Sequence, residues 1–539
     1  MYRSFLILIA LAFTLCACNK PSGGSGTSSI RTGPVVHGNG GINFGGWHTY
    51  GGDHTQTRHV KASGPAAPEI LWEYDYTADI PVPDGTEISF YVNEPLVDAD
   101  GNIYVHVSWM DFGADIDFSN SNDTAVEIAM VTESITMFGR RPGYLLCLDP
   151  QGSLKWITEF EDGDSIGYAI MPAGYIAIVV SGSYIPEKQL EREVNAAVKK
   201  AAQPGYDPLS DMVNYENLFN KMEYSSAIHL VKSDGSIAGT IERRGHSIGG
   251  VLVTSGNQLV TTLTEEIKEF PDLTREYTPP ATKLAAFSID GRELWSRDDL
   301  EMCRPIAELP NHLLLCETGS FEGDGMLVAL DSAGATVWDF KLPEGSLYHS
   351  VVDTDNKQVL LFRQHHTKPE KNKLYCISFD GQPLAKHEMP TPFRTVPVLL
   401  GDGSIVTQDN PGHYIDYTNM DYDKWESSDE SEPDKLSRYS PEGELLWTKD
   451  FGFAEYTMGL ISDIDGVLYM TYGEDPFSGY LDDRLPTVPS GVMAISNDGE
   501  IIWHENISDY EFLIDLAMGP DGTLICAADT KIVAIGERK

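Results

Sequence analysis

The residues best suited to bind a ligand lie together in one polar stretch, residues 409–434. This stretch combines many carboxylates with His413, Tyr414, Tyr417, Tyr422 and Trp425. Aromatic rings beside carboxylates can stack on sugars or hold cations. We therefore take these aromatic and histidine residues as candidates for contact with a ligand or partner, with a solvated loop of no such role as the alternative.

Side chains that could hold a metal are fewer. Residues 98–101 and 463–466 both read Asp-x-Asp-Gly, and calcium prefers closely spaced oxygen ligands. Asp-Gly is also a strong hairpin signal, so we expect ordinary turns and no metal site, with calcium as the alternative. The adjacent His365 and His366 would point to opposite faces of a strand and make poor joint ligands there, with a position in the loop as the alternative.

The usual sequence contexts of catalysis do not occur in this chain. It has no phosphate-binding loop, no Cys-x-x-Cys pair and no zinc spacing, each of which marks a particular chemistry. The pattern Gly-x-Ser-x-Gly occurs at residues 163–167 and 245–249, but neither copy has the strand-to-helix context of a nucleophile elbow. We therefore expect no catalytic residue and no cofactor.

Five of the cysteines follow the export region and are expected to be small buried residues. They are Cys147, Cys303, Cys316, Cys376 and Cys526. Cys303 and Cys316 could face each other across one hairpin, so a disulfide is the alternative to two thiols there.

The chain is strongly acidic. Lys and Arg number 38 against 81 Asp and Glu, which gives a formal net charge of −43. Such a surface repels phosphate backbones and excludes nucleic acid as a partner. It also opposes electrostatic docking on anionic lipid, whereas cationic partners or divalent ions would be attracted.

Residues 1–17 are typical of an export signal. Arg3 precedes an apolar run from Phe5 to Leu15, which is shorter than the roughly 20 residues that span a membrane. The run ends in Leu15-Cys16-Ala17-Cys18. This sequence resembles the bacterial lipobox and implies lipid attachment at Cys18; a plain signal peptide with a chance cysteine is the alternative.

A Gly- and Ser-rich tether follows, residues 18–45, of a composition that stays flexible. Asn19 differs from the aspartate that retains many Gram-negative lipoproteins at the inner membrane. The resemblance therefore implies an outer-membrane location, facing the periplasm or the cell surface.

One hairpin unit recurs along the chain and indicates the fold. In the copy at residues 327–338, Gly334 follows an alternating strand and Trp338 ends the next one. Glycine suits the positive-φ position of a tight turn, and an aromatic at a fixed offset can pack against the next copy. The docking aromatics are Trp72, Trp156, Trp295, Trp338, Trp447 and Trp503, and the copies at Gly239 and Ala385 lack the tryptophan.

A second element, strand-turn-strand, occurs eight times between these units, for example at residues 95–105. Four strands per cycle predict four-stranded antiparallel blades. The half-unit at residues 531–536 complements the half-unit at residues 70–74, and joining them removes the free sheet edges. We therefore predict an all-β, eight-bladed β-propeller over residues 46–539.

The pattern Leu-x-Ala-x-Asp-x-x-Gly-x-x-x-Trp resembles the tryptophan-docking repeat of pyrroloquinoline-quinone-like (quinoprotein-type) propellers. Residues 47–53, with Thr57-Arg58, Gly64-Pro65 and Trp72, resemble the N-terminal segment of that family, whereas Arg438 departs from the motif by replacing a small residue. The resemblance implies that the protein could be a dehydrogenase, an enzyme that holds a quinone and calcium on the propeller axis. The adjacent-cysteine pair of many such enzymes does not occur here.

The lipid anchor and eight blades are also similar to the propeller lipoproteins of the outer-membrane barrel-assembly machinery. Those proteins are smaller and lack long insertions. The insertions of this chain are at residues 109–142, 182–225, 263–281, 409–434 and 473–490.

Every insertion falls between the second and third strands of a blade, which places them all on one face. Loops on a rigid scaffold are where binding residues concentrate; passive loop growth is the alternative. Residues 186–203 predict an amphipathic helix with Leu190, Val194 and Val198 on its apolar side. This helix would pack on the rim or, alternatively, occupy a groove in a partner.

These features predict a monomeric, membrane-anchored, non-catalytic propeller. It would bind a protein or glycan partner through the face that carries the insertions. The alternative function is a periplasmic quinone-dependent oxidoreductase, with pyrroloquinoline quinone and calcium as cofactors.

Overall fold

The computed structural model describes the β-sheets and the shorter connections of the chain. The described residues are 42, 58–82, 87–113, 142–161, 164–201, 223–243, 245–265, 281–300, 303–319, 325–341, 346–364, 372–389, 397–409, 435–451, 459–473, 489–508, 513–528 and 530–538. The candidates at 413–425, Cys18, the tether before Ile42 and the His365–His366 pair lie outside them.

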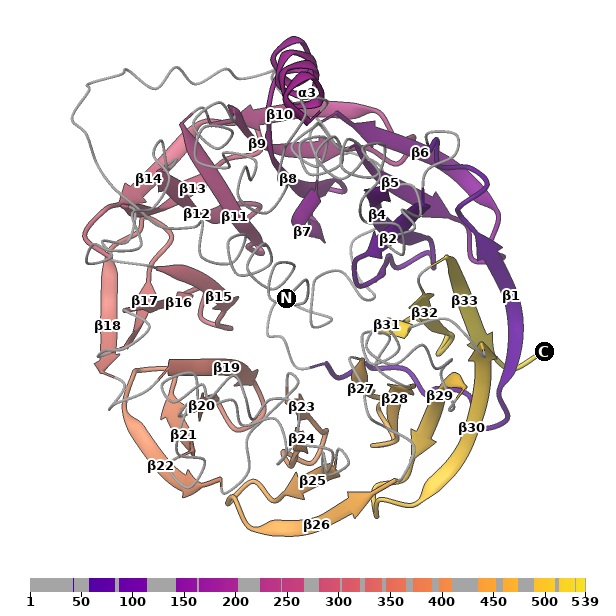
Figure 1. The fold of residues 1–539 in the computed structure, drawn as a ribbon. Helices are drawn as coiled ribbons and strands as arrows, with labels where there is room; N and C mark the ends of the chain where they lie inside the picture. Colours follow the sequence, from indigo (N-terminus) through magenta and orange to yellow (C-terminus); the bar gives the residue numbers. More distant parts are fainter. Residues whose placement is uncertain are drawn as a thin grey trace.

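Eight antiparallel sheets stand around a common axis in the described part of the chain (Figure 1). Seven of them have four consecutive strands in sequence order, and the sheet that contains β2 carries one additional short strand; the eighth combines β31, β32 and β33 with β1. We name these sheets blades 1 to 8 in chain order, and we count the strands of a blade from the axis outward. The predicted eight-bladed, four-stranded architecture is confirmed.

The strands of the first four blades have the following bounds. Blade 1 contains β2 (Glu87–Val92), β3 (Leu96–Val97), β4 (Ile103–Gly113), β5 (Gly143–Leu148) and β6 (Leu154–Phe160); blade 2 contains β7 (Asp164–Ile170), β8 (Ile176–Tyr184), β9 (Glu223–Val231) and β10 (Ile237–Glu242); blade 3 contains β11 (His246–Val253), β12 (Leu259–Glu265), β13 (Thr282–Phe287) and β14 (Glu293–Arg297); blade 4 contains β15 (Arg304–Glu308), β16 (Leu314–Thr318), β17 (Met326–Leu330) and β18 (Thr336–Lys341).

The remaining blades follow the same order. Blade 5 contains β19 (Ser346–Asp353), β20 (Gln358–Gln364), β21 (Lys373–Ser378) and β22 (Pro383–Glu388); blade 6 contains β23 (Val398–Leu399), β24 (Ile405–Asp409), β25 (Lys435–Tyr439) and β26 (Leu445–Asp450); blade 7 contains β27 (Leu460–Ser462), β28 (Leu468–Tyr472), β29 (Ser490–Ile495) and β30 (Ile501–Ser508); blade 8 contains β31 (Leu513–Met518), β32 (Leu524–Ala528), β33 (Lys531–Gly536) and β1 (Glu69–Asp75).

Blade 8 joins the two ends of the described chain. Its outermost strand, β1, pairs antiparallel with β33 in a register that places Trp72 opposite Ala534 and Tyr74 opposite Ile532. Because this pairing completes the last blade, the ring has no unfinished sheet between its ends. The predicted closure by the two half-units is confirmed.

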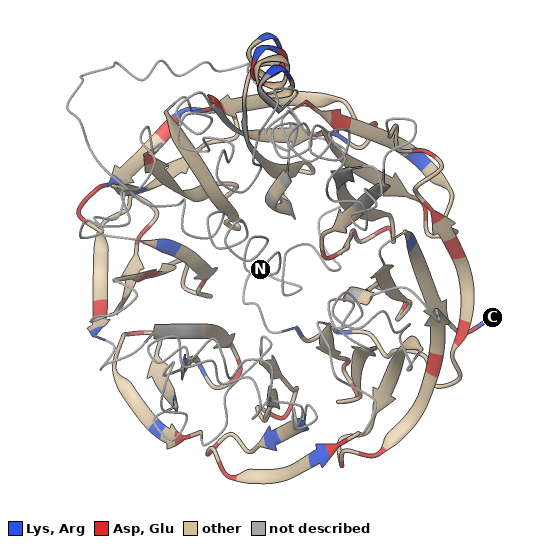
Figure 2. Cartoon of the chain, viewed as in Figure 1, with Lys and Arg blue, Asp and Glu red and all other residues tan. Residues whose placement is uncertain are grey.

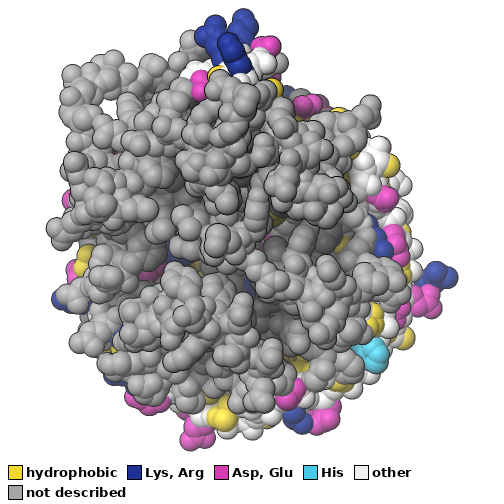
Figure 3. Space-filling view, viewed as in Figure 1, with side chains coloured by type: hydrophobic (Ala, Val, Ile, Leu, Met, Phe, Trp, Pro, Cys, Tyr) yellow, Lys and Arg dark blue, Asp and Glu magenta, His cyan; other side chains and the backbone are white. Residues whose placement is uncertain are grey.

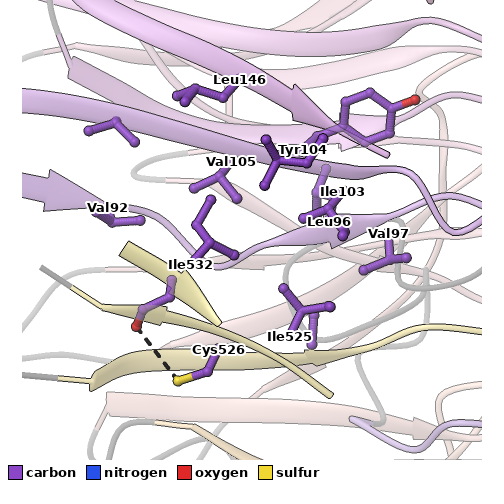
Figure 4. Packing of buried hydrophobic residues seen from close by; sticks show 14 of the residues in the cluster. Val92, Leu96, Val97, Ile103, Tyr104, Val105, Leu146, Ile525, Cys526 and Ile532 are labelled. Carbon is purple, nitrogen blue, oxygen red and sulfur yellow. Dashed lines mark hydrogen bonds between the residues drawn. The ribbon is translucent and has the colours of Figure 1, made fainter. Parts of the chain in front are cut away.

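The core lies between the blades. All six residues of β5 and all five of β32 are buried, because both faces of these strands contact neighbouring blades. The outermost strand β18 instead alternates between exposed and partly buried residues. At the junction of blades 8 and 1, Ile525 and Ile532 belong to the same apolar cluster as Ile103 and Val105 (Figure 4).

The turn between the third and fourth strands explains the glycine of the repeat. In blade 4, Gly334 has a φ of 81°, a conformation that side chains with a Cβ rarely adopt. The carboxylate of Asp331 accepts the backbone N–H groups of Ala333 and Ala335, both at 2.9 Å. The Asp and Gly of the repeat therefore fix the same turn.

The tryptophans dock on the chain that follows them around the ring. Each indole N–H donates to a backbone carbonyl: Trp72 to Pro150, Trp156 to Ser233, Trp295 to Ser332, Trp338 to Phe379, Trp447 to Asn497 and Trp503 to Pro65. A Cβ added to Gly334 would lie 2.6 Å from Cδ2 of Trp295. Glycine is therefore required both for the turn and for the indole that covers it.

Two departures from the repeat are compensated locally. In blade 5, Ala385 occupies the tryptophan register, and His387 covers Gly443 instead. In blade 6, the guanidinium of Arg438 donates to Asp402 at 2.6 Å and to the carbonyl of Asn497 at 2.5 Å. Arg438 thus links its own blade to blade 7, which explains why a large residue is accommodated there.

The two faces of the disc carry different connections. Those between the second and third strands of a blade leave from the face that also carries the blade-to-blade connections; we call it the insertion-bearing face. The opposite face, with the short turns, we call the turn face. Strands β4, β8 and β12 extend to Gly113, Tyr184 and Glu265, which is farther than the predicted starts of those insertions.

One helix, α3 (Glu187–Ala201), lies at the periphery of the disc (Figure 1). It falls within residues 186–203, where a helix was predicted. Leu190, Val194 and Val198 are partly buried, whereas Lys188 and Arg192 are exposed. Among the described residues, no helix has both the length and the apolar character needed to cross a membrane.

Candidate functional site

Five long connections begin and end at the insertion-bearing face of the ring. The connection between β8 and β9 covers residues 185–222, and that between β24 and β25 covers residues 410–434. The second of these contains the aromatic candidates named above, which lie outside the described residues. The turn face is plain by comparison, since β31 and β32 are joined by residues 519–523 alone.

In the acidic turns of the turn face, the first aspartate accepts hydrogen bonds from residues of its own turn. Asp98 accepts the backbone N–H groups of Asp100 and Asn102 at 2.9 and 2.8 Å, and the hydroxyl of Tyr104 at 2.9 Å. Asp463 makes the same set of bonds with Asp465, Val467 and Tyr469. These carboxylates therefore stabilise turns, which accounts for the Asp-x-Asp-Gly pattern without calcium.

A charged cluster, Arg58 with Glu94 and Asp515, lies at the inner edge of blades 7, 8 and 1. Arg58 is 1% exposed, and its Nη2 lies 3.4 Å from Oε2 of Glu94. Its Nη1 lies 3.4 Å from Oδ1 of Asp515 in β31 and donates to the carbonyl of Leu460 in β27. One guanidinium thus binds three consecutive blades; we call this the axial cluster.

The axial cluster holds two carboxyl groups and one guanidinium. Burial raises the pKa of Asp515, and the positive charge of Arg58 offsets part of this rise. Tyr168 of β7 donates its hydroxyl to the carbonyl of Glu94 at 2.6 Å, which extends the contacts to blade 2. On the same inner edge, burial and the charges of Arg58 and Arg304 lower the pKa of His349 to about 3.

The segment after Arg58 continues along blade 7. Val60 donates its N–H to the carbonyl of Ser462 at 2.8 Å, and Ser462 donates to the carbonyl of Arg58 at 2.9 Å. His59 pairs with Ser462 in a parallel bridge. Arg58 belongs to the segment whose sequence resembles the quinoprotein propellers. Sequence alone did not identify its carboxylate partners, because Glu94 is 36 residues and Asp515 is 457 residues away along the chain.

The described residues do not fit a quinone with calcium. That pair requires several carboxylate and amide oxygens directed at open space on the axis. Glu94 and Asp515 reach the inner edge together, but both are bound to Arg58. The described part of the chain also contains no group of three or more His, Cys, Asp or Glu residues with the spacing of a metal site.

A serine, a histidine and a glutamate do meet at the turns of blades 3 and 4. The hydroxyl of Ser255 lies 2.8 Å from Oε1 of Glu308 and 3.2 Å from Nδ1 of His312. The same Nδ1 lies 3.2 Å from Glu308. In a catalytic triad the serine and the acid bind opposite nitrogens of the histidine ring. Here both lie at Nδ1, so these hydrogen bonds link two turns.

The five described cysteines are all free and buried. Cys303 and Cys316 are neighbours, and burial together with the nearby Cys303 thiol raises the pKa of Cys316. The structure therefore shows the pair as thiols, the first of the two states considered above.

Residues of both charges are scattered along the outer strands (Figure 2), and Lys and Arg side chains of α3 stand at the edge of the disc (Figure 3). Lys188, Arg192 and Lys199 are exposed on this helix. The described rim is therefore mixed in charge, and α3 itself contains four basic and three acidic residues.

No family model matches this chain, and no curated protein matches it. Among solved structures, a europium-containing methanol dehydrogenase is 10% identical with a TM-score of 0.48, and the match covers 89% of each chain. Virginiamycin B lyase from Staphylococcus aureus is 12% identical with a TM-score of 0.35, covering 59% of this chain and 92% of that one.

A protein of unknown function from Bacteroides caccae is 13% identical with a TM-score of 0.30, and the match covers 52% of this chain and 90% of that one. At such identities these similarities concern the fold alone.

Proposed function

We propose that this protein is a lipid-anchored, non-catalytic propeller that binds a protein or glycan partner through its insertion-bearing face. The asymmetry of the disc carries this proposal: long connections crowd one face, such as residues 185–222 and 410–434, while short turns cover the other. Rigid scaffolds commonly present binding loops in this way.

The axial cluster supports the non-catalytic part of the proposal. An enzyme with its cofactor on the axis would need free ligands there, whereas both carboxyl groups of the axial cluster are bound to Arg58. Its contacts with blades 7, 8 and 1 give it a clear structural role.

Binding is tested with the mature chain on an array of glycans and against cross-linked outer-membrane extract. A variant with Tyr414, Tyr417, Tyr422 and Trp425 changed to alanine is expected to lose at least about tenfold in affinity, since each aromatic contributes around 1 kcal/mol. The matched control changes Val337 and Leu384 to serine, which are 54% and 56% exposed on outer strands, and should bind normally. Equal binding by both variants would refute the assignment of this loop.

The proposal that the protein is not an enzyme is tested by titrating it with pyrroloquinoline quinone and calcium. We expect no saturable binding and no dye-linked alcohol oxidation. Tight binding together with oxidation would overturn the proposal in favour of a quinone-dependent oxidoreductase.

A further inference from the structure

Blade 5 contains a buried cation that has no partner among the described residues. Arg363 in β20 is 6% exposed. Within the part of the chain that the structure describes, its Nε makes no hydrogen bond and no acid forms an ion pair with it. A buried guanidinium loses its hydration and, without a compensating anion, destabilises the fold.

A second cation and an unpaired hydroxyl share its face of the sheet. Arg363 lies directly opposite Lys373 of β21, and side chains of such cross-strand pairs are neighbours. Leu361 lies two residues before Arg363 in β20 and therefore on the same face of the sheet. It is paired with Tyr375 on one side and with Ser350 on the other. The hydroxyl of Ser350 is also buried and has no hydrogen-bond partner among the residues that the structure describes.

This face of blade 5 looks toward blade 4. Leu361 and Tyr375 belong to one apolar cluster with Leu315 of blade 4, and the rings of Phe340 and Tyr375 are 6.4 Å apart. Arg363 lies near the end of β20, where the connection to β21 leaves. It therefore lies in the crevice between blades 4 and 5, close to the insertion-bearing face.

Positive charge exceeds negative charge in this crevice. Burial and the charges of Lys386 and Arg363 lower the pKa of Lys373. Lys373 pairs with Glu388, whose side chain is 70% exposed. On the facing blade, Glu317 is engaged by Arg304 at 2.7 Å. Such a local excess of cations is unexpected in a protein with a net charge of −43.

We propose that the crevice between blades 4 and 5 binds an oxyanion, the carboxylate, sulfate or phosphate group of a ligand. Arg363 would donate two parallel hydrogen bonds, Lys373 would supply a second charge, and the Ser350 hydroxyl is available as a further donor. The site is independent of the lipid anchor and of the aromatic loop, so either proposal can fail alone.

The test uses the mature chain with sodium sulfate, sodium phosphate and sodium galacturonate, each against sodium chloride at equal ionic strength. Arg363→Met removes the charge and keeps much of the volume. The matched control is Arg243→Met, because Arg243 is equally buried but bonded to Glu293 at 3.0 Å. Calorimetric titration gives the affinity, and thermal unfolding gives the stability.

We expect at least one of the three anions to bind the wild type and the Arg243 variant, and to bind the Arg363 variant at least about tenfold more weakly, as for loss of a charge-assisted hydrogen bond. Which anion binds most tightly distinguishes a sugar carboxylate from an inorganic ion. Without added anion, Arg363→Met should be at least as stable as the wild type, since it removes an uncompensated charge.

Two results would overturn the proposal. One is an unchanged anion affinity in the Arg363 variant. The other is evidence that an acid of the chain itself neutralises Arg363. Glu322, Asp324 and Glu344 lie outside the described residues, and changing all three to amides would then destabilise the wild type but not the Arg363 variant.

Discussion

A single guanidinium binds two buried carboxyl groups at the inner edge of the ring, so its removal should destabilise the folded protein. We predict that Arg58→Met lowers the free energy of unfolding by about 3–5 kcal/mol, because Glu94 and Asp515 lose their counter-charge. Denaturant titration measures the loss.

The destabilisation caused by Arg58→Met should be smaller at low pH. The pKa of Asp515 is raised in the folded protein, so the stability contributed by its protonated form is present at low pH and is lost as pH rises through the folded pKa. Arg58→Met should therefore cost less at about pH 4 than at about pH 7. The double variant with Asp515→Asn should recover stability at neutral pH, and no recovery would contradict this account.

The imidazole of His106 gives a pH prediction of the opposite sign. Burial lowers its pKa to about 3, Asn93 contacts its Nδ1 at 3.2 Å, and its Nε2 is buried without a partner. The unfolded chain takes up a proton near pH 6.5 and the folded chain does not, so this contribution to stability is lost as pH falls from about 6.5 toward 3.

At about pH 5 the loss should reach about 2 kcal/mol, from 1.5 pH units at about 1.4 kcal/mol each. The variant His106→Asn should remove this part of the pH dependence, as measured by denaturant titration between these pH values. His312→Asn is the control, because the side chain of His312 is 75% exposed; a similar change in both variants would argue against the assignment.

At the scale of the elements, the docked tryptophan is the contact that joins one outer strand to the next blade. Gly334→Ala should destabilise the protein by both backbone strain and the clash with Trp295, which a Cβ would approach to 2.6 Å. Gly245→Ala isolates the strain, because Gly245 has a φ of 76° and no atom within 4 Å of an added Cβ.

We expect about 1–2 kcal/mol for Gly245→Ala, the cost of the left-handed conformation, and clearly more for Gly334→Ala. Thermal unfolding of the two variants gives the comparison. Equal losses would show that the indole contributes nothing through this contact.

These elements also show what could be predicted from the sequence. The Gly-to-Trp spacing within 327–338 predicted the hairpin and the docking position, because both depend on local geometry. The same pattern could not predict that His387 covers Gly443, or that Arg438 reaches Asn497 in the next blade, because those contacts depend on how blades face one another.

The candidate site was predicted less completely. The aromatic residues at 413–425 were found by composition, and their arrangement is not among the described residues. The axial cluster and the crevice at Arg363 were missed, because residues such as Arg58 and Asp515 are distant in sequence and a single Arg or Asp has no distinctive pattern. Only the register of the folded blades brings such charges together.

For the molecule as a whole, closure of the ring depends on β33. A chain that stops after Thr530 lacks the strand that pairs with both β32 and β1, and we predict that it loses cooperative unfolding. The control stops after Glu537 and removes an exposed ion pair between Arg538 and Glu69, which should cost less than about 1 kcal/mol. Circular dichroism during thermal unfolding distinguishes the two, and a cooperative transition in the shorter chain would disprove this dependence.

Membrane attachment is predicted to depend on one thiol. Cys18→Ser should move the protein from the detergent phase to the aqueous phase in a detergent phase-separation assay, and should abolish incorporation of labelled palmitate. Cys147→Ser is the control, since Cys147 is buried in β5. Incorporation that persists in the Cys18 variant would rule out this residue as the attachment point.

The position of Ile42 has a consequence for orientation. This residue is buried and donates its N–H to the carbonyl of Gly174 at 3.0 Å, in the turn between β7 and β8, so the described chain begins on the turn face. With lipid attached at Cys18, as we propose, this contact would favour an orientation in which the turn face is directed at the bilayer. A partner that approaches from the other side would then meet the insertion-bearing face first.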